Sequence, residues 1–247
     1  PTLTKETLSK NFKLMASYTT ESGNTENGNS NMRLALSHVN GTVLEPGQVF
    51  SYNDTIGDST NPENGWLPAG GLSGGVLVQM YGGGICQIST TLYNAVLRSD
   101  LEIIARSGHT RKVRYIGGGL DAALSGKDKD FVFRNNTDSD IYVFMWVDES
   151  QKTLCCEIYG CPFPSDFDRV DTVSELTSST PPSEPQFVLD SALEPGECVL
   201  KRKAIAGSTY QSYRVYSLNG EIIRRVPIDK TEYPMHPALY AVGQGKS

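Results

Sequence analysis

Residues 81–93 read YGGGICQISTTLY, in which three glycines precede one cysteine and an apolar pattern of helical period. Glycine lets backbone or substrate approach where a Cβ would collide. A helix that begins beside Cys86 directs its free N–H groups and the positive end of its dipole at the sulfur, which favours thiolate over thiol. The stretch has two interpretations: Cys86 is a nucleophile, or it is a buried structural cysteine, since unpaired cysteines are often interior.

A cysteine nucleophile needs a base and a group that orients the base. The sequence contains three histidines, His38, His109 and His236. His38 is adjacent to the apolar Val39 in a predicted helix and is most simply structural or exposed, and His236 lies near the end of the chain. By elimination, His109 is the best partner for Cys86.

The predicted secondary structure is α+β, mostly antiparallel β with two short helices. One helix is expected to start at Asn31 and end before Gly41, after a polar loop over residues 21–29. The second is expected to start at Cys86, after a glycine-rich stretch, residues 57–84, that we expect to form a long loop walling the site. Strands are expected where apolar residues lie between turn signals, at residues 11–20, 49–52, 76–78, 101–104, 112–116, 131–133, 141–146 and 154–159.

A change in composition marks a second part of the chain. Residues 174–185 are rich in Ser, Thr, Pro and Glu, which is typical of a linker or of the start of an extended strand. Asn219-Gly220 predicts a hairpin between the strand-like residues 213–216 and 221–224. We therefore expect a first domain over residues 1–165, a linker over 166–184 and a small all-β domain over 185–247.

Composition limits the classes of function. The 247-residue chain carries a formal net charge of −6, which argues against general nucleic-acid binding. No apolar run approaches the roughly 20 residues that cross a bilayer. The five cysteines fit no zinc pattern, and we expect mostly buried thiols with room for one disulfide. Neither a metal nor a cofactor is expected.

The glycine–cysteine stretch resembles, from Gly82 to Ala95, the signature of the VanW domain family. The sequence differs from the family pattern at Gly117-Gly118, where a proline-containing turn is common. The residues from Gly196 to Gly243 resemble a G5 module, a β-rich domain that often accompanies cell-wall proteins. Further stretches match the VanW pattern in the same order, and they are Asn31–Ala35, Asn40–Ser51, His109–Tyr115, Gly119–Ala122 and Phe133–Thr137.

The resemblance implies a reaction, because some VanW members are associated with L,D-transpeptidation of peptidoglycan through a cysteine. It implies that Cys86 is the nucleophile, that His109 is its general base, and that Asp121 or a backbone carbonyl orients the imidazole. The implied partners are peptidoglycan stem peptides and glycan. The residues expected to contact them are Gly83, Gly84, Gln87, Arg106, Arg111 and Trp66. The two arginines would receive stem carboxylates, and a solvated strand face is the alternative interpretation of both. Core packing is the alternative role for the tryptophan.

Two alternatives to a transpeptidase stay open. A cysteine hydrolase, acting as a carboxypeptidase or endopeptidase on the stems, would use the same Cys–His pair and give the acyl group to water. A non-catalytic wall-binding protein would bury Cys86. The resemblance implies a location outside the cytoplasm, at the cell wall or cell surface, with any membrane anchor lying outside this sequence.

Overall fold

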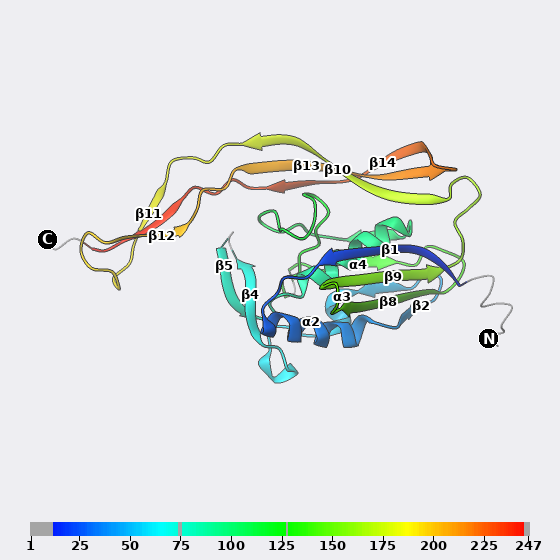
Figure 1. The fold of residues 1–247 in the computed structure, drawn as a ribbon, viewed down its shortest axis with the longest axis horizontal. Coiled ribbons are helices and arrows are strands. Elements are labelled where there is room, and N and C mark those ends of the chain that lie inside the picture. Colours follow the sequence, from blue (N-terminus) through cyan, green and yellow to red (C-terminus); the bar gives the residue numbers. More distant parts are fainter. Residues whose placement is uncertain (1–11, 74–75, 127, 245–247) are drawn as a thin grey trace.

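The fold is mostly antiparallel β-sheet with few short helices, as the sequence predicted. The computed structural model describes residues 12–73, 76–126 and 128–244. Figure 1 shows a body that holds the N-terminal strands and the helices, and a long β-ribbon that crosses the body and continues beyond it. The C-terminus lies at the far tip of this ribbon.

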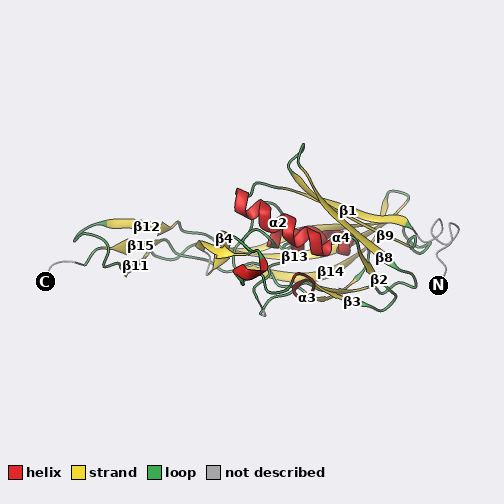
Figure 2. Ribbon diagram, turned by 90° about the horizontal axis from the view of Figure 1, so that it is seen from below, coloured by secondary structure: helices red, strands yellow, loops and turns green. Residues whose placement is uncertain are grey.

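The body is built on a four-stranded antiparallel sheet. In spatial order its strands are β1 (Lys13–Glu21), β9 (Thr153–Gly160), β8 (Ile141–Asp148) and β2 (Thr42–Leu44). Alternating residues of β8 and β9, such as Val143 and Ile158, are buried on one face, and helices α2 (Glu26–Val39) and α4 (Cys86–Arg98) pack against the sheet. Figure 2 shows the two helices next to each other in red. The start of α4 is therefore fixed to the core.

Two smaller β units complete the body. They are a three-stranded antiparallel sheet of β3 (Val49–Ser51), β7 (Val132–Arg134) and β6 (Glu102–Ala105), and a hairpin of β4 (Pro68–Ser73) and β5 (Val76–Tyr81). The short helices α3 (Tyr52–Ile56) and η1 (Pro62–Asn64) lie between β3 and β4. Residues 57–84 are therefore not the long loop that we expected, because much of this stretch is the hairpin. Strand β5 ends immediately before the glycine turn that precedes Cys86.

Helix α2 starts before Asn31, which we expected to cap it. Thr25 is the cap, and its hydroxyl accepts the Gly28 N–H at 3.2 Å, so part of the expected polar loop is helical. Asn31 lies inside the helix, and its Nδ2 donates to the carbonyls of Leu67 at 2.8 Å and Gly83 at 2.9 Å. The Leu67 N–H donates in return to Asn31 Oδ1 at 2.8 Å. The buried amide thus ties α2 to the glycine turn.

The glycine turn, residues 82–84, leaves no room for side chains. A Cβ on Gly83 would lie 2.4 Å from the carbonyl oxygen of Ala69 in β4. Gly82 has a φ of +69°, and a Cβ there would lie 2.7 Å from the carbonyl oxygen of Ser59. These glycines are therefore required for backbone to pack on backbone, which sets the position where α4 begins.

The ribbon consists of two three-stranded sheets. One is antiparallel and joins β10 (Arg169–Thr180), β13 (Gly207–Leu218) and β14 (Glu221–Tyr233). The other joins β11 (Gln186–Leu189), β15 (Leu239–Val242) and β12 (Cys198–Arg202), with β11 parallel to β15. The predicted hairpin at Asn219-Gly220 is present, with both residues at positive φ. Residues 166–184, expected as a linker, include β10, which pairs along its length with β13.

Two other local expectations were wrong. Residues 112–116 form no strand; the segment is irregular, and Val113 and Tyr115 pack against the core instead of pairing. The cysteines are not mostly buried thiols, because Cys156 alone is buried and Cys198 is exposed. All five cysteines lie in the described part of the chain and are free of disulfides.

The close packing of the glycine turn predicts the effect of a methyl group there. We expect Gly83→Ala to lower the free energy of unfolding by about 1–3 kcal/mol, because the methyl meets the backbone of Ala69. Gly23→Ala is the matched control, since a Cβ at Gly23 meets nothing within 4 Å; the expected change is under about 0.5 kcal/mol. Urea denaturation followed by circular dichroism measures both, and equal effects would contradict this explanation.

Candidate active site

Cys86 is the first residue of α4, and Ile85 alone separates it from the glycine turn. Its side chain is partly exposed, whereas the residues from Gln87 to Leu97 are buried. In the first turn of α4, the N–H groups of Gln87 and Ile88 already donate to the carbonyls of residues 84 and 85. The Cys86 N–H has no acceptor among the described residues. The helix start therefore presents one partly exposed cysteine and its own backbone donor.

Polar side chains of α4 hold the segment that carries Asp121. The Ser89 hydroxyl donates to the carbonyl of Ala122 at 2.7 Å, and the Thr90 hydroxyl accepts the Ala122 N–H at 3.0 Å. One turn later, Asn94 Nδ2 donates to the carbonyl of Leu120 at 2.8 Å. These bonds explain why polar residues occupy a fully buried helix face, and they bring Asp121 alongside the helix that begins with Cys86.

The sulfur of Cys86 has two neighbours that favour a negative charge. The Leu124 N–H donates to Sγ at 3.4 Å, and the His109 side chain lies close enough to the thiol to lower its pKa. His109 Nδ1 lies 2.6 Å from Asp121 Oδ2, and the His109 backbone N–H donates to the same oxygen at 2.7 Å. Because Nδ1 is engaged by Asp121, Nε2 is the nitrogen left to face the sulfur. The structure therefore brings the three predicted residues, Cys86, His109 and Asp121, into one cluster, in which Asp121 is hydrogen-bonded to the imidazole and the imidazole acts on the thiol.

The Asp121 carboxylate is fully buried and is satisfied on both oxygens. Its Oδ1 accepts Nη2 of Arg106 at 3.1 Å and the hydroxyl of Tyr233, which reaches it from β14. The Arg106 side chain is itself only 4% exposed, and its Nε donates to the Asp121 carbonyl at 2.5 Å. An ionised carboxylate in the interior requires such partners, because an unpaired buried charge is very unfavourable.

The contacts shift all three pKa values. Burial raises the pKa of the Cys86 thiol, but the hydrogen bond and charge of His109, together with the Leu124 N–H, lower it overall. Burial lowers the pKa of His109, but its hydrogen bonds to Asp121 and Cys86 raise it to about 9. Burial raises the pKa of Asp121, but the hydrogen bond and charge of His109, then the charge of Arg106, lower it to about 2. At neutral pH His109 is therefore an imidazolium and Asp121 a carboxylate, and the Cys86 thiol ionises at a lower pH than it would without His109.

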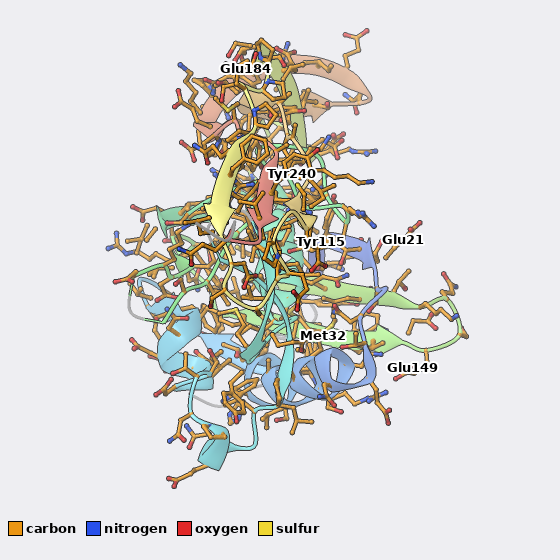
Figure 3. All side chains as sticks on the ribbon, turned by 90° about the vertical axis from the view of Figure 1, so that its left-hand side faces the viewer. Glu21, Met32, Tyr115, Glu149, Glu184 and Tyr240 are labelled. Carbon is orange, nitrogen blue, oxygen red and sulfur yellow. The ribbon has the colours of Figure 1, made fainter. Side chains whose placement is uncertain are left out.

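Two phenols lie close enough to Cys86 to respond to its charge, and sequence reasoning assigned neither to the site. Burial, and then the Cys86 charge, raise the pKa of Tyr52 and of Tyr115 (labelled in Figure 3) well above the usual range, so both stay protonated. The Tyr115 hydroxyl bonds with Thr90. The buried Tyr52 hydroxyl has no partner among the described residues. The only sequence signal for Tyr115 was its place at the end of the His109–Tyr115 stretch.

Several residues expected to contact substrate are instead used inside the protein. Gln87 is buried, and its Nε2 donates to the Thr20 hydroxyl and the Glu21 carbonyl at 2.9 and 2.7 Å. Trp66 is 1% exposed and belongs to the core. Arg106 is turned towards Asp121, so it is not free to receive a substrate carboxylate.

The remaining three residues have different environments. Gly83 is buried, and its carbonyl accepts the Asn31 amide. Gly84 is partly exposed beside Cys86, with a φ of +100°. Arg111 is partly exposed. Gly84 and Arg111 therefore stay candidates for substrate contact, whereas Gly83 has a packing role that the sequence alone did not distinguish.

Comparison with known proteins identifies the family. The family model described as VanW like protein matches residues 27–159, more than half of the chain. This chain belongs to the VanW family. The matched region includes the site residues Cys86, His109 and Asp121, but it ends before Tyr233.

The VanW chain is also similar to two curated proteins. It is 38% identical over 113 residues to the uncharacterized protein YoaR of Bacillus subtilis, which covers 46% of this chain and 37% of YoaR. It is 32% identical over 133 residues to the vancomycin B-type resistance protein VanW of Enterococcus faecalis, which covers 51% of this chain and 47% of that protein. The matches thus span less than half the length of either relative.

Part of the chain is similar to two solved G5 structures. The IgA1 protease G5 domain is 17% identical, with a TM-score of 0.21, over 31% of this chain and 92% of that domain. The HP0197-G5 structure is 16% identical, with a TM-score of 0.17, over 30% of this chain and 97% of that structure. Within the described ranges, no helix combines the length and apolar character needed to cross a membrane. The same ranges contain no cluster of three or more His, Cys, Asp or Glu residues suited to a metal ion.

The pKa directions predict how Cys86 reacts with iodoacetamide. The thiol pKa is lowered, so half-maximal alkylation is expected at a lower pH than that of a free cysteine. The imidazolium should persist until the pH rises through about 9. In His109→Ala, burial would act on the thiol without the imidazolium to offset it. We therefore expect the midpoint to rise and alkylation at pH 7 to slow by about tenfold or more.

Peptide-resolved mass spectrometry measures this reaction, with the exposed Cys198 as an internal reference for an accessible thiol. His38→Ala is the matched control, because His38 is exposed on α2 and should leave the profile unchanged. Labelling of Cys86 only after unfolding would show that the sulfur is a structural thiol.

Proposed function

We propose that this VanW protein is a cysteine-dependent L,D-transpeptidase that forms 3→3 cross-links between peptidoglycan stem peptides outside the cytoplasm. The observation that carries the proposal is the cluster of the partly exposed Cys86, His109 and the buried Asp121, in which the carboxylate is hydrogen-bonded to the imidazole and the imidazole lowers the thiol pKa. The description of the Enterococcus faecalis relative as a vancomycin B-type resistance protein supports a role at the cell wall.

In the first half-reaction, the Cys86 thiolate attacks the carbonyl carbon at the L-configured centre of the stem diamino acid. The tetrahedral intermediate carries an oxyanion, and the Cys86 N–H at the helix start is a backbone donor on the nucleophile's own residue that can stabilise it. Collapse breaks the amide bond to the terminal D-Ala, whose amine takes the proton from the His109 imidazolium. D-Ala leaves, and a thioester joins the stem to Cys86.

In the second half-reaction, the side-chain amine of another stem attacks the thioester carbonyl. Neutral His109 accepts a proton from that amine, and the carbon–sulfur bond breaks. An amide cross-link forms, and the thiolate and imidazolium are restored, so each step balances with one donor stem, one acceptor stem and one D-Ala released. Throughout, Asp121 remains ionised and holds the imidazole in one orientation, since its pKa is about 2.

The pKa of His109 suits both half-reactions. A pKa of about 9 keeps His109 protonated before acylation, when it must act as an acid. Formation of the thioester removes the thiolate, one of the groups that raises that pKa, so the imidazole loses its proton more readily when it must act as a base. The two roles therefore follow from the charge state of the sulfur.

The proposal predicts the products formed from a disaccharide-tetrapeptide. The wild-type protein should produce cross-linked dimers, and Cys86→Ala should produce none while keeping the fold. Cys86→Ser should be nearly as inactive, because a serine hydroxyl is not ionised by His109. Cys198→Ser is the matched control, because this exposed cysteine lies in β12 at the far end of the ribbon.

Liquid chromatography with mass spectrometry identifies the products. Dimers that disappear in Cys86→Ala and persist in Cys198→Ser support the transpeptidase. Shortened monomers with no dimers would instead show a hydrolase, and dimers from Cys86→Ala would refute the mechanism.

A further inference from the structure

Residues of the ribbon contact the turn that precedes Asp121. The Tyr210 ring of β13 lies against Gly118, where a Cβ would come within 2.5 Å of it. Ser174 of β10 donates to the Gly118 carbonyl, and Ser212 of β13 donates to the Gly119 carbonyl at 2.9 Å. Gly119 has a φ of +83°, and its N–H donates to the Tyr233 hydroxyl at 2.8 Å. Gly118 and Gly119 therefore let the ribbon approach the backbone of the site.

Strand β14 also holds the other partner of Asp121. Arg106 Nη1 donates to Asp229 Oδ2 at 2.9 Å and to the Thr231 hydroxyl at 2.7 Å. The opposite side of the same guanidinium faces Asp121. Two groups of β14 thus orient the arginine that orients the carboxylate.

Tyr233 connects the ribbon to the carboxylate directly. It is 4% exposed, and its hydroxyl donates to Asp121 Oδ1 while accepting the Gly119 N–H. The Tyr233 hydroxyl is therefore both a donor and an acceptor. Because it accepts the Gly119 N–H, its own proton points towards Asp121. With Oδ1 held by Tyr233 and Arg106, Oδ2 is the oxygen that remains for His109.

We propose that Tyr233 is a positioning residue of the Cys86 site, so that the C-terminal ribbon is part of the catalytic machinery as well as a β-module. Tyr233 acts through Asp121. Without its hydroxyl, the carboxylate has one donor fewer on Oδ1 and can turn towards Arg106, which weakens its hold on the imidazole. The imidazolium is then less well stabilised, and so is the thiolate that it faces. A catalytic role for the ribbon rests on the proposed function. The positioning effect of Tyr233 is measured independently, as the reactivity of the Cys86 thiol.

The charged and titratable groups around Asp121 come from several elements. Arg106 and His109 lie on the loop after β6, Tyr233 and Asp229 on β14, and Cys86 and Tyr93 on α4, with Tyr115 on the irregular segment. Tyr233 is the hydroxyl among them that donates to the carboxylate. Its removal leaves every formal charge of this set in place, so a change in the pH profile reports on orientation.

The test is the pH profile of Cys86 alkylation in the full chain. We expect Tyr233→Phe to slow alkylation at pH 7 by at least about fivefold and to move the midpoint to higher pH. Tyr213→Phe is the matched control from the same sheet, because its ring lies under Arg225, 4.4 Å from the guanidinium carbon, with no contact to Asp121. The control should retain the wild-type rate and midpoint.

Thermal unfolding of each variant separates positioning from folding. If Tyr233→Phe does not fold, Thr231→Val is the second test. This variant removes a hydroxyl that accepts from Arg106, and it should also slow the alkylation of Cys86. A Tyr233→Phe profile that matches wild type would overturn the proposal, as would an equal change in Tyr213→Phe. Alkylation needs no peptidoglycan, so a protein that forms no dimers but depends on Tyr233 for thiol reactivity would refute the transpeptidase and keep this inference.

Discussion

The buried negative charge of Asp121 is the constraint on which the site depends. A carboxylate in the interior is tolerated only if its oxygens are paired, and here His109 takes one oxygen while Arg106 and Tyr233 take the other. The same pairing fixes the imidazole, which in turn stabilises the thiolate of Cys86. The reactivity of the sulfur is therefore set by a group that never touches it.

Two different parts of the chain satisfy this constraint. Helix α4 carries Cys86 at its start and holds residues 120–122 through Ser89, Thr90 and Asn94. Strand β14 supplies Tyr233 and orients Arg106 from the opposite direction. Glycine is required at both junctions, at Gly83 against β4 and at residues 118–119 against the ribbon, because the chain lies against its neighbours there. The departure from the family pattern at Gly117-Gly118 coincides with the place where the ribbon docks.

Much of the fold could be predicted because its strands alternate between buried and partly exposed residues, as β8 and β9 do. The segment at residues 112–116 has strand-like composition, but its apolar residues pack into the core next to the site, which a local pattern does not show. The start of α2 was missed because its first turn, around Gly28, consists of residues that also favour turns.

The residues of the candidate site that local sequence patterns mark could be predicted. The contacts that depend on distant segments coming together could not. Cys86 follows from the glycine turn, and His109 follows by elimination among three histidines. Tyr233 lies 112 residues from Asp121, so no spacing rule connects them. Arg106 was expected to face substrate, and it faces inward because Asp121, Asp229 and Thr231 surround it.

The central claim is that the Cys86 sulfur forms a covalent acyl-enzyme, and intact-protein mass spectrometry after mixing with a disaccharide-tetrapeptide tests it most directly. We predict a mass increase equal to the substrate minus its terminal D-Ala, located by proteolysis on the peptide that contains residues 81–93 and lost on addition of hydroxylamine. An unmodified protein under conditions in which product accumulates, or an adduct on any other residue, would contradict the account.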